Sequence, residues 1–190
     1  MRYATDTSVS VSKTRGEIEE MVTRSGASKF FSGAEDGRAF VGFVMRCNVR
    51  NCPDCSSIGG KPALKRQYEC DLCQRTGKVH DLRNVMFELP LPKSDGFKLN
   101  GLRRTRTPEK QHEAWEQACR SSWRALLLAI KAKLVSVESG VESFEEAFLA
   151  QLVVKDDEGR AVRFGVRAVK AIAEAYMRNG PPQLLLGSGS

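Results

Sequence analysis

Two segments of the chain carry apolar residues in the pattern of buried β-strands. Residues 38–45 (RAFVGFVM) and 83–89 (RNVMFEL) are short apolar runs rich in valine and phenylalanine, a composition that favours strand over helix. Pro90 and Pro92 end the second segment, because proline cannot donate to a strand ladder. The two segments directly flank a polar, cysteine-rich stretch. We therefore expect a β-hairpin whose tip is expanded into a module of its own.

Apolar residues at three- and four-residue steps predict the longest helix, which starts at Thr107 and Pro108 and stops at Gly140. Its apolar stripe consists of Trp115, Cys119, Trp123, Leu126, Leu127, Ile130, Leu134 and Val137. Shorter helices are expected over residues 14–25 and 166–178, and a capping box from Ser143 to Glu146 opens another. In the last helix we expect an inward face made of Val169, Ile172, Ala173 and Tyr176.

Threonine, serine and valine alternate over residues 3–11, which predicts a strand, and residues 153–164 can form a small hairpin. The predicted fold class is α+β, with a small antiparallel sheet packed by helices and a zinc-knuckle module at the tip of a β-hairpin. Residues 1–46 and 81–186 are expected to form one domain. Residues 47–80, the cysteine module, are expected to be a zinc-binding insertion, and residues 187–190 a flexible tail.

Two C-x-x-C motifs, Cys52/Cys55 and Cys70/Cys73, lie in the cysteine module. A C-x-x-C turn points two thiolates at one centre, so two such turns supply the four soft ligands of a closed tetrahedral zinc site. The sequence therefore predicts a structural Zn²⁺ ion held by these four residues. A redox dithiol and a pair of structural disulfides are the alternatives. Cys47 and His80 are spare candidate ligands at the base of the module, and we expect the first to be a small apolar residue and the second a surface residue.

The chain has 190 residues and a formal net charge of +7, a balance that favours an acidic partner without identifying it. It contains no apolar run long enough to span a membrane and no apolar targeting segment at its start. We therefore expect a cytoplasmic protein without a membrane partner.

Basic residues punctuate the cysteine module and precede the longest helix. Those expected to contact nucleic acid are Lys61, Lys65, Arg66, Arg75, Lys78, Arg103, Arg104 and Arg106. The predicted function is a zinc-stabilised nucleic-acid-binding accessory protein that contacts the phosphate backbone, with DNA favoured over RNA. The first alternative is a protein-binding adaptor or inhibitor that uses the zinc module as its interaction surface.

A metal-dependent nuclease is the second alternative, because carboxylates from separate elements could assemble in the fold. The sequence has neither a phosphate-cradling G-x-x-x-x-G-K-[ST] motif nor a G-x-G-x-x-G motif. Its two histidines, His80 and His112, have no nucleophile signature nearby. No catalytic residue is predicted.

Three stretches outside the cysteine module carry a resemblance: YATDTSVSVSKTRGEIE, RNVMFELPLP and WRALLLAIKAKLVSVESGVESFEEAFLA. On these stretches the chain resembles a family of small uncharacterised proteins of phages, prophages and related bacterial genomes. The resemblance implies that a short turn joins the two strands in relatives and that the double C-x-x-C module is an insertion. It implies a mobile-element setting and no particular activity.

Overall fold

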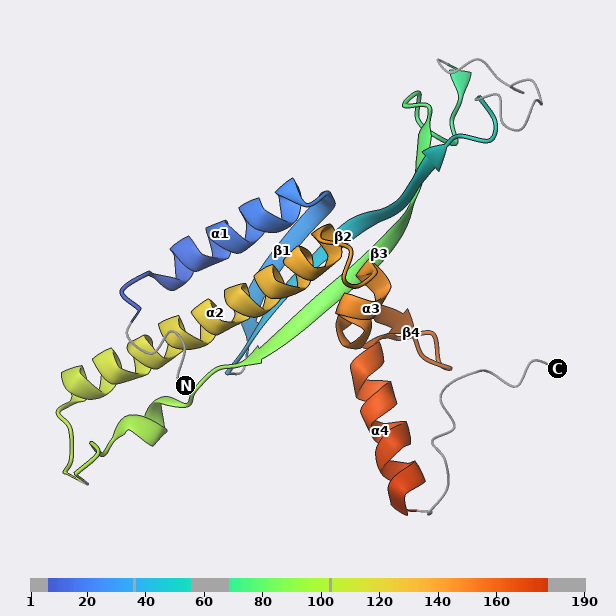
Figure 1. Ribbon diagram of the computed structural model, residues 1–190. Coiled ribbons are helices and arrows are strands. Elements are labelled where there is room, and N and C mark those ends of the chain that lie inside the picture. Colours follow the sequence, from blue (N-terminus) through green and yellow to red (C-terminus); the bar gives the residue numbers. More distant parts are fainter. Residues whose placement is uncertain (1–6, 36, 56–68, 103, 178–190) are drawn as a thin grey trace.

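The computed structural model describes residues 7–35, 37–55, 69–102 and 104–177. Its elements, in chain order, are α1 (Val11–Arg24), β1 (Ala27–Glu35), β2 (Arg38–Asn51), β3 (Lys78–Pro90), the 3₁₀ turn η2 (Ser94–Phe97), α2 (Pro108–Glu138), α3 (Phe144–Phe148), the 3₁₀ turn η3 (Leu149–Gln151), β4 (Val153–Lys155), β5 (Ala161–Arg163) and α4 (Phe164–Met177). The predicted α+β class, with a cysteine cluster at the end of a β-hairpin, is confirmed (Figure 1).

The first helix begins earlier than its apolar pattern predicted. Ser10 is the N-cap, and its side chain accepts a hydrogen bond from the Lys13 backbone N–H, which satisfies one of the free donors of the first turn. The expected strand over residues 3–11 is therefore wrong in its described part, residues 7–11, where α1 starts at Val11. Thr14, where the predicted helix begins, is instead inside α1, fully buried, and donates its hydroxyl to the Ser10 carbonyl.

The sheet is antiparallel in the order β1-β2-β3. β1 pairs with β2 from Glu35↔Arg38 to Ala27↔Met45, whereas the β2–β3 ladder continues to Asn51↔Lys78. Beyond the end of β1, the two strands therefore form a ribbon that projects from the body (Figure 1). We call this ribbon, residues 46–51 and 78–82, the arm. A bulge between Cys47 and Arg50 interrupts it.

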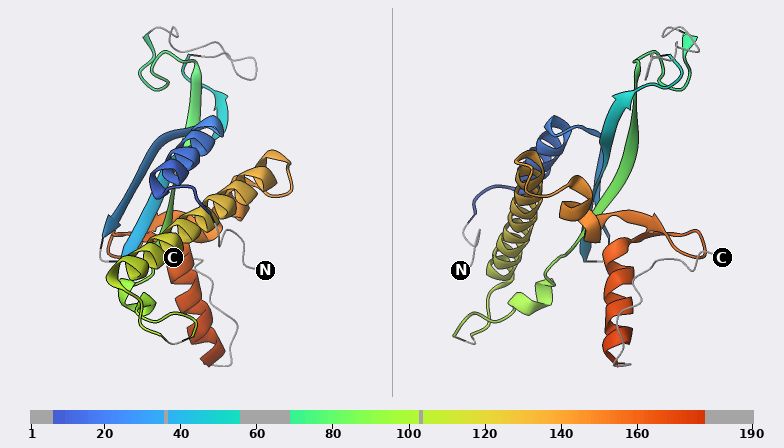
Figure 2. Two further views of the ribbon diagram at one scale, coloured as in Figure 1. Left: turned by 90° about the vertical axis from the view of Figure 1, so that its left-hand side faces the viewer. Right: turned by 45° about the vertical axis from the view of Figure 1, so that its right-hand side comes forward.

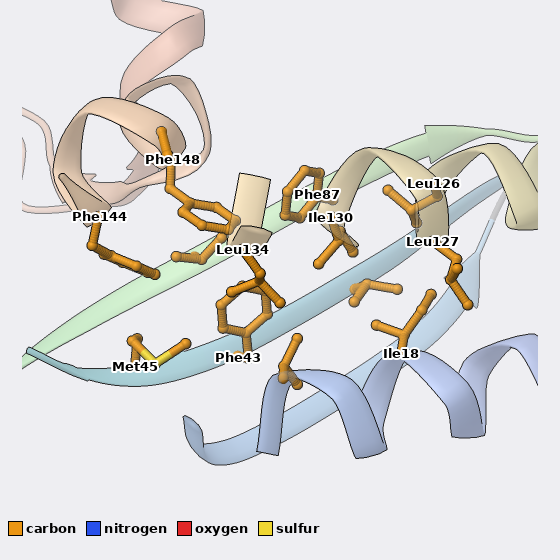
Figure 3. Close-up of a cluster of buried hydrophobic side chains, with 14 of the residues drawn as sticks. Ile18, Phe43, Met45, Phe87, Leu126, Leu127, Ile130, Leu134, Phe144 and Phe148 are labelled. Atoms are coloured by element: carbon orange, nitrogen blue, oxygen red, sulfur yellow. The ribbon is translucent and has the colours of Figure 1, made fainter. Parts of the chain in front are cut away.

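The core fills the space between one face of the sheet and the helices. Alternate residues of β2 point into this core. Figure 3 shows side chains of α1 and α2 packing against them. Phe148 of α3 is fully buried, with ring centroids 5.8 Å from Phe43, 6.3 Å from Phe87 and 4.6 Å from Phe144. These edge-to-face and stacked aromatic contacts close the core where α2 ends. Its main members are Ile18, Val22, Val41, Phe43, Met45, Val85, Phe87, Trp123, Leu126, Leu127, Ile130, Leu134, Phe144 and Phe148.

Helix α2 confirms the predicted apolar stripe. Residues 119, 123, 126, 127, 130 and 134 are buried. Its ends are also as expected: Thr107 caps it and Pro108 is its first residue, while Gly140 follows the end with a left-handed φ of 71°. Trp115 is half-buried and donates its indole N–H to the Pro92 carbonyl, 2.8 Å away. Each end of the helix is thus specified by local sequence.

The capping box at Ser143 and the β4–β5 hairpin are both confirmed. The inward face predicted for the last helix is wrong, because Val169 is 68% exposed and Tyr176 is 79% exposed. Helix α4 packs mainly on η3 and β5 and extends away from the sheet (Figures 1 and 2). In the part of the chain that the structure describes, no helix is long and apolar enough to cross a membrane.

Candidate metal centre

The two C-x-x-C motifs bring four thiols together at the end of the arm. The sulfur atoms of Cys52, Cys55, Cys70 and Cys73 all lie within 4.8 Å of one another. The Sγ atoms of Cys52 and Cys70 are 3.7 Å apart, and those of Cys55 and Cys73 are 3.5 Å apart. Zn–S bonds of about 2.3 Å in a tetrahedron place the sulfurs about 3.8 Å apart. The cluster therefore has the spacing that a tetrahedral metal–thiolate site requires.

The structure forms no disulfide among these four cysteines. A disulfide joins its sulfur atoms at about 2.05 Å, and both of these sulfur pairs are far longer. The cysteines of the cluster are free thiols. The four groups are thus available together as ligands.

The second motif is shaped by a tight turn after Cys73. The Arg75 backbone N–H donates to the Cys70 carbonyl at 3.2 Å, while Gln74 and Arg75 adopt left-handed φ values of 49° and 69°. Thr76 supports this conformation by donating its hydroxyl to the Cys73 carbonyl at 2.6 Å. Residues other than glycine keep a left-handed backbone conformation only where surrounding hydrogen bonds hold them in it. The turn is therefore built to position the cysteines.

Gly77 connects the two halves of the cluster. Its backbone N–H donates to Cys73 Sγ at 3.3 Å, and its carbonyl accepts from the Cys52 N–H at 2.9 Å. Its φ of 71° is left-handed, a conformation that glycine adopts without strain. One glycine thus links the second cysteine turn to the end of β2.

The centre is closed to solvent on most sides. Cys52, Cys70 and Cys73 are buried and Cys55 is half-buried, and Val79 packs against them. A site with four protein ligands and no open position suits a structural ion, because a catalytic metal keeps a position for water or substrate. The donor set of four thiolates selects a soft or borderline metal.

The thiols of the cluster do not titrate alike. Burial and a hydrogen bond to Cys73 raise the pKa of Cys55 to about 12. Burial also raises the pKa of Cys73, but the Gly77 N–H and the three neighbouring thiols outweigh it and lower that pKa to about 7. The cluster therefore favours one thiolate at Cys73, the form that a metal binds.

Cys47 and His80 lie outside this group. Among the described residues, the four clustered cysteines are the set whose ligand atoms converge. Cys47 is half-buried on β2 and packs against the main core, while His80 is exposed on β3. Their expected roles as a small apolar residue and a surface residue agree with these positions. Carboxylates do not converge in a group of three anywhere in the described part of the chain.

A polar network that the sequence did not predict holds the base of the arm. Asp81 accepts hydrogen bonds from Asn48 Nδ2 at 3.0 Å and Arg50 Nη1 at 3.2 Å. These bonds lower the pKa of Asp81 below its ordinary value of 3.8. Arg83 continues the network to Glu145 at the start of α3, 2.9 Å away. The partners are more than thirty residues apart in sequence, so only the paired strands reveal them.

The residues expected to contact nucleic acid fall in two separate places. Arg75 and Lys78 are exposed beside the metal centre. Arg104 and Arg106 lie on the loop before α2, at the opposite end of the molecule (Figure 1). Arg106 also has a local task, since its guanidinium donates to the carbonyls of Phe97 and Leu99 at 3.1 and 2.7 Å. Lys61, Lys65, Arg66 and Arg103 lie outside the described residues.

The two groups thus do not form one continuous basic surface within the described structure. A single basic face shared by the module and this loop would have favoured nucleic acid as the ligand. The basic residues of the arm are therefore a surface separate from those of the loop.

No model of a protein family, no curated protein and no solved structure matches this chain.

Proposed function

We propose that this protein is a zinc-stabilised nucleic-acid-binding accessory protein whose arm contacts the phosphate backbone. The observation that supports this most is the concentration of positive charge on the arm and module. Residues 46–83 contain eight lysines and arginines and four acidic residues, a formal net charge of +4 out of +7 for the whole chain. Four thiolates and one Zn²⁺ together add −2, so the zinc-loaded segment carries +2 out of +5. Since the arm projects from the body (Figure 1), the exposed cations on it, Arg46 and Lys78, are within reach of an extended polyanion.

Zinc is the metal we propose for the four cysteines, because closed Cys₄ sites at this spacing are typical of structural zinc. The ion would hold the end of the arm rigid, since this polar segment has only a small apolar cluster of its own. It would supply no chemistry at a substrate. Reduced thiols are typical of a reducing compartment, so we propose a cytoplasmic location. A phage or mobile-element origin stays a prediction.

Two cations of the arm are suited to phosphate contact. Arg46 and Lys78 are both exposed, and neither forms an ion pair with any described residue. The acid nearest the base of the arm, Asp81, is already bound by Arg50. Its charge is therefore compensated within the protein and opposes an incoming phosphate less.

The experiment is fluorescence anisotropy of labelled DNA and RNA against zinc-loaded protein over a salt series. The affinity should fall steeply with salt, with a slope of about −0.9 per phosphate contact on duplex DNA and about −0.7 on single strands. The double variant R46Q/K78Q should weaken binding and reduce the slope by up to about 2. The control K110Q/K170Q changes the same charge at exposed positions on α2 and α4. Binding that is unaffected by R46Q/K78Q, or absent at low salt, would contradict the proposal.

A protein-binding adaptor or inhibitor is the second candidate. Leu72, between the ligands of the second motif, is 55% exposed, and Val49 on the arm is 62% exposed. Exposed apolar side chains on a rigid metal-bound turn can anchor a protein partner. Loss of partner binding in Leu72→Asn, with nucleic-acid binding absent in the wild type, would favour this candidate.

A further inference from the structure

The sheet has a second face that the main core does not use. In the observed register, side chains on this face come from alternate residues of each strand. We call this the outer face; it consists of Lys29, Phe31, Gly33 and Glu35 of β1, Arg38, Phe40, Gly42, Val44 and Arg46 of β2, and Leu82, Asn84, Met86 and Glu88 of β3. Helices α1 and α2 lie together on the opposite side of the sheet (Figure 2). The outer face is thus left with several apolar side chains at the surface.

Two phenylalanines on the outer face lie across glycines of the neighbouring strand. Phe31 pairs with Gly42, and a Cβ at Gly42 would come within 2.1 Å of the Phe31 ring. Phe40 pairs with Gly33, where a Cβ would come within 2.3 Å of the Phe40 ring. Only glycine permits these ring positions. The two rings therefore lie diagonally next to each other on the sheet.

The rings remain accessible. Phe31 is 46% exposed and Phe40 is half-buried. Phe40 and Met86 also line a shallow hollow of about 430 Å³, together with Arg38 and Glu88. A surface aromatic pair of this kind has room above it for a flat ligand.

The charge beside the rings is positive. Lys29 is two residues from Phe31 on the same strand face, and Arg46 is two residues beyond Val44, which pairs with Lys29. Both are exposed, and neither forms an ion pair within the described structure. Of the two acids on the face, Glu88 is bound by Arg163 at 2.7 Å, and Glu35 lies directly across the strands from Arg38. The available charge on the outer face therefore favours an anion that runs from the rings toward the arm.

We propose that the outer face binds single-stranded nucleic acid, with bases stacking on Phe31 and Phe40 and phosphates contacting Lys29 and Arg46. Unpaired bases present their faces to an aromatic platform, whereas bases in a duplex are already stacked on one another. Arg46 belongs both to the outer face and to the arm. A nucleic-acid strand bound on the outer face would therefore continue onto the arm. The inference rests on the proposed nucleic-acid function and deepens it by naming the ligand class.

A purely structural reading of the aromatic pair makes a different prediction. Aromatic rings that cover strand glycines stabilise sheets. If this is their only role, replacing Phe31 changes stability and leaves nucleic-acid binding as it was. Binding and stability therefore have to be measured on the same variants.

The test uses the full-length, zinc-loaded protein and fluorescein-labelled oligo(dT), a single-stranded RNA and a DNA duplex of equal length. The wild type should bind the two single strands more tightly than the duplex. Phe31→Ala should weaken single-strand binding by roughly 5- to 150-fold, the range for the loss of one base–aromatic stack, and leave duplex binding unchanged. Phe31→Trp should restore binding, and its added tryptophan fluorescence should be quenched by oligo(dT).

The matched control is Tyr176→Ala, which removes an aromatic ring that is 79% exposed on α4 and should change nothing. Thermal unfolding of each variant verifies that it is folded. Equal affinity of wild type and Phe31→Ala for oligo(dT), or equal affinity of the wild type for single strand and duplex, would overturn this inference while leaving the arm proposal intact. Self-association that depends on Phe31 would also overturn it. Failure to bind any of the three nucleic acids would remove the proposed function itself.

Discussion

Removal of the metal should unfold the end of the arm and leave the body folded. The four-cysteine cluster and the main core share no residue. The two are joined by the arm strands and by the network from Asp81 to Glu145. The apparent binding free energy of structural zinc, on the order of 10–16 kcal/mol, goes into folding the segment that holds it. Here that segment is small and lies apart from the body.

The expected magnitude follows from linkage. If the metal site and the body unfolded as one unit, free zinc at 100 times its Kd would add about 2.7 kcal/mol to the free energy of unfolding. If the end of the arm unfolds on its own, the added stability of the body is close to zero. On removal of the metal, we expect the free energy of unfolding of the body to change by less than about 0.5 kcal/mol. Surface substitutions remote from a core have effects of this size.

The chain provides a probe that separates the two cases. Its two tryptophans, Trp115 and Trp123, both lie on α2, so their fluorescence reports the body. Guanidinium titrations with zinc and after chelation should give the same tryptophan-reported midpoint. Metal binding by the four cysteines is measured separately. Co²⁺ replaces the zinc, and its thiolate absorption bands show whether the site is occupied. Cys70→Ser should abolish those bands, and the control Cys47→Ser should retain them. A tryptophan-reported loss of about 2.7 kcal/mol or more on chelation would refute the separation of arm and body.

Three further predictions concern the body and the base of the arm. Phe148→Ala should lower the free energy of unfolding by about 3–5 kcal/mol, because it empties a fully buried ring site; a loss below about 1 kcal/mol in chemical denaturation would mean that Phe148 is not central to the core. Ser143→Ala should cost about 1 kcal/mol through loss of the capping box, and Ser143→Asp should recover most of it. Because Asn48 and Arg50 lower the pKa of Asp81, its stabilising contribution is present above its ordinary pKa of 3.8 and is lost as pH falls through the lower folded value. The protection of amides at the arm base against exchange, relative to the unfolded chain, should therefore fall below about pH 4 in the wild type, and an identical acid dependence in Asp81→Asn would show that another group is responsible.

The parts of the fold that local sequence specifies were predictable. Thr107 and Pro108 fixed the start of α2, and the steps between its apolar residues fixed its buried stripe. The cysteine cluster was predictable for the same reason, since each C-x-x-C motif places two thiols within a single turn. Both signals operate over a few residues, where spacing determines geometry.

The predictions that were wrong rest on sequence patterns that do not specify which other part of the chain contacts them. Alternating serine and valine before residue 11 has the period of a strand, but Ser10 captures the Lys13 N–H and starts a helix there. The apolar face of α4 has the correct period, yet periodicity does not state what covers the face, and Val169 and Tyr176 are exposed.

The outer face was not predictable for a related reason. Phe31, Phe40, Gly33 and Gly42 come from different strands, and only the pairing register places each ring on its glycine. From the sequence alone, these phenylalanines indicate extended structure and nothing more. Only the paired strands of the sheet therefore show that the two rings form one aromatic surface.

The most direct test of the account is the metal content of the purified protein, measured by native mass spectrometry alongside cysteine alkylation. We predict one zinc ion per chain. In the zinc-bound protein Cys52, Cys55, Cys70 and Cys73 should be protected from alkylation, and chelation should make them reactive. A chain that binds no zinc at stoichiometric concentration, with these four cysteines alkylated equally fast with and without zinc, would contradict the claim that they form a metal centre.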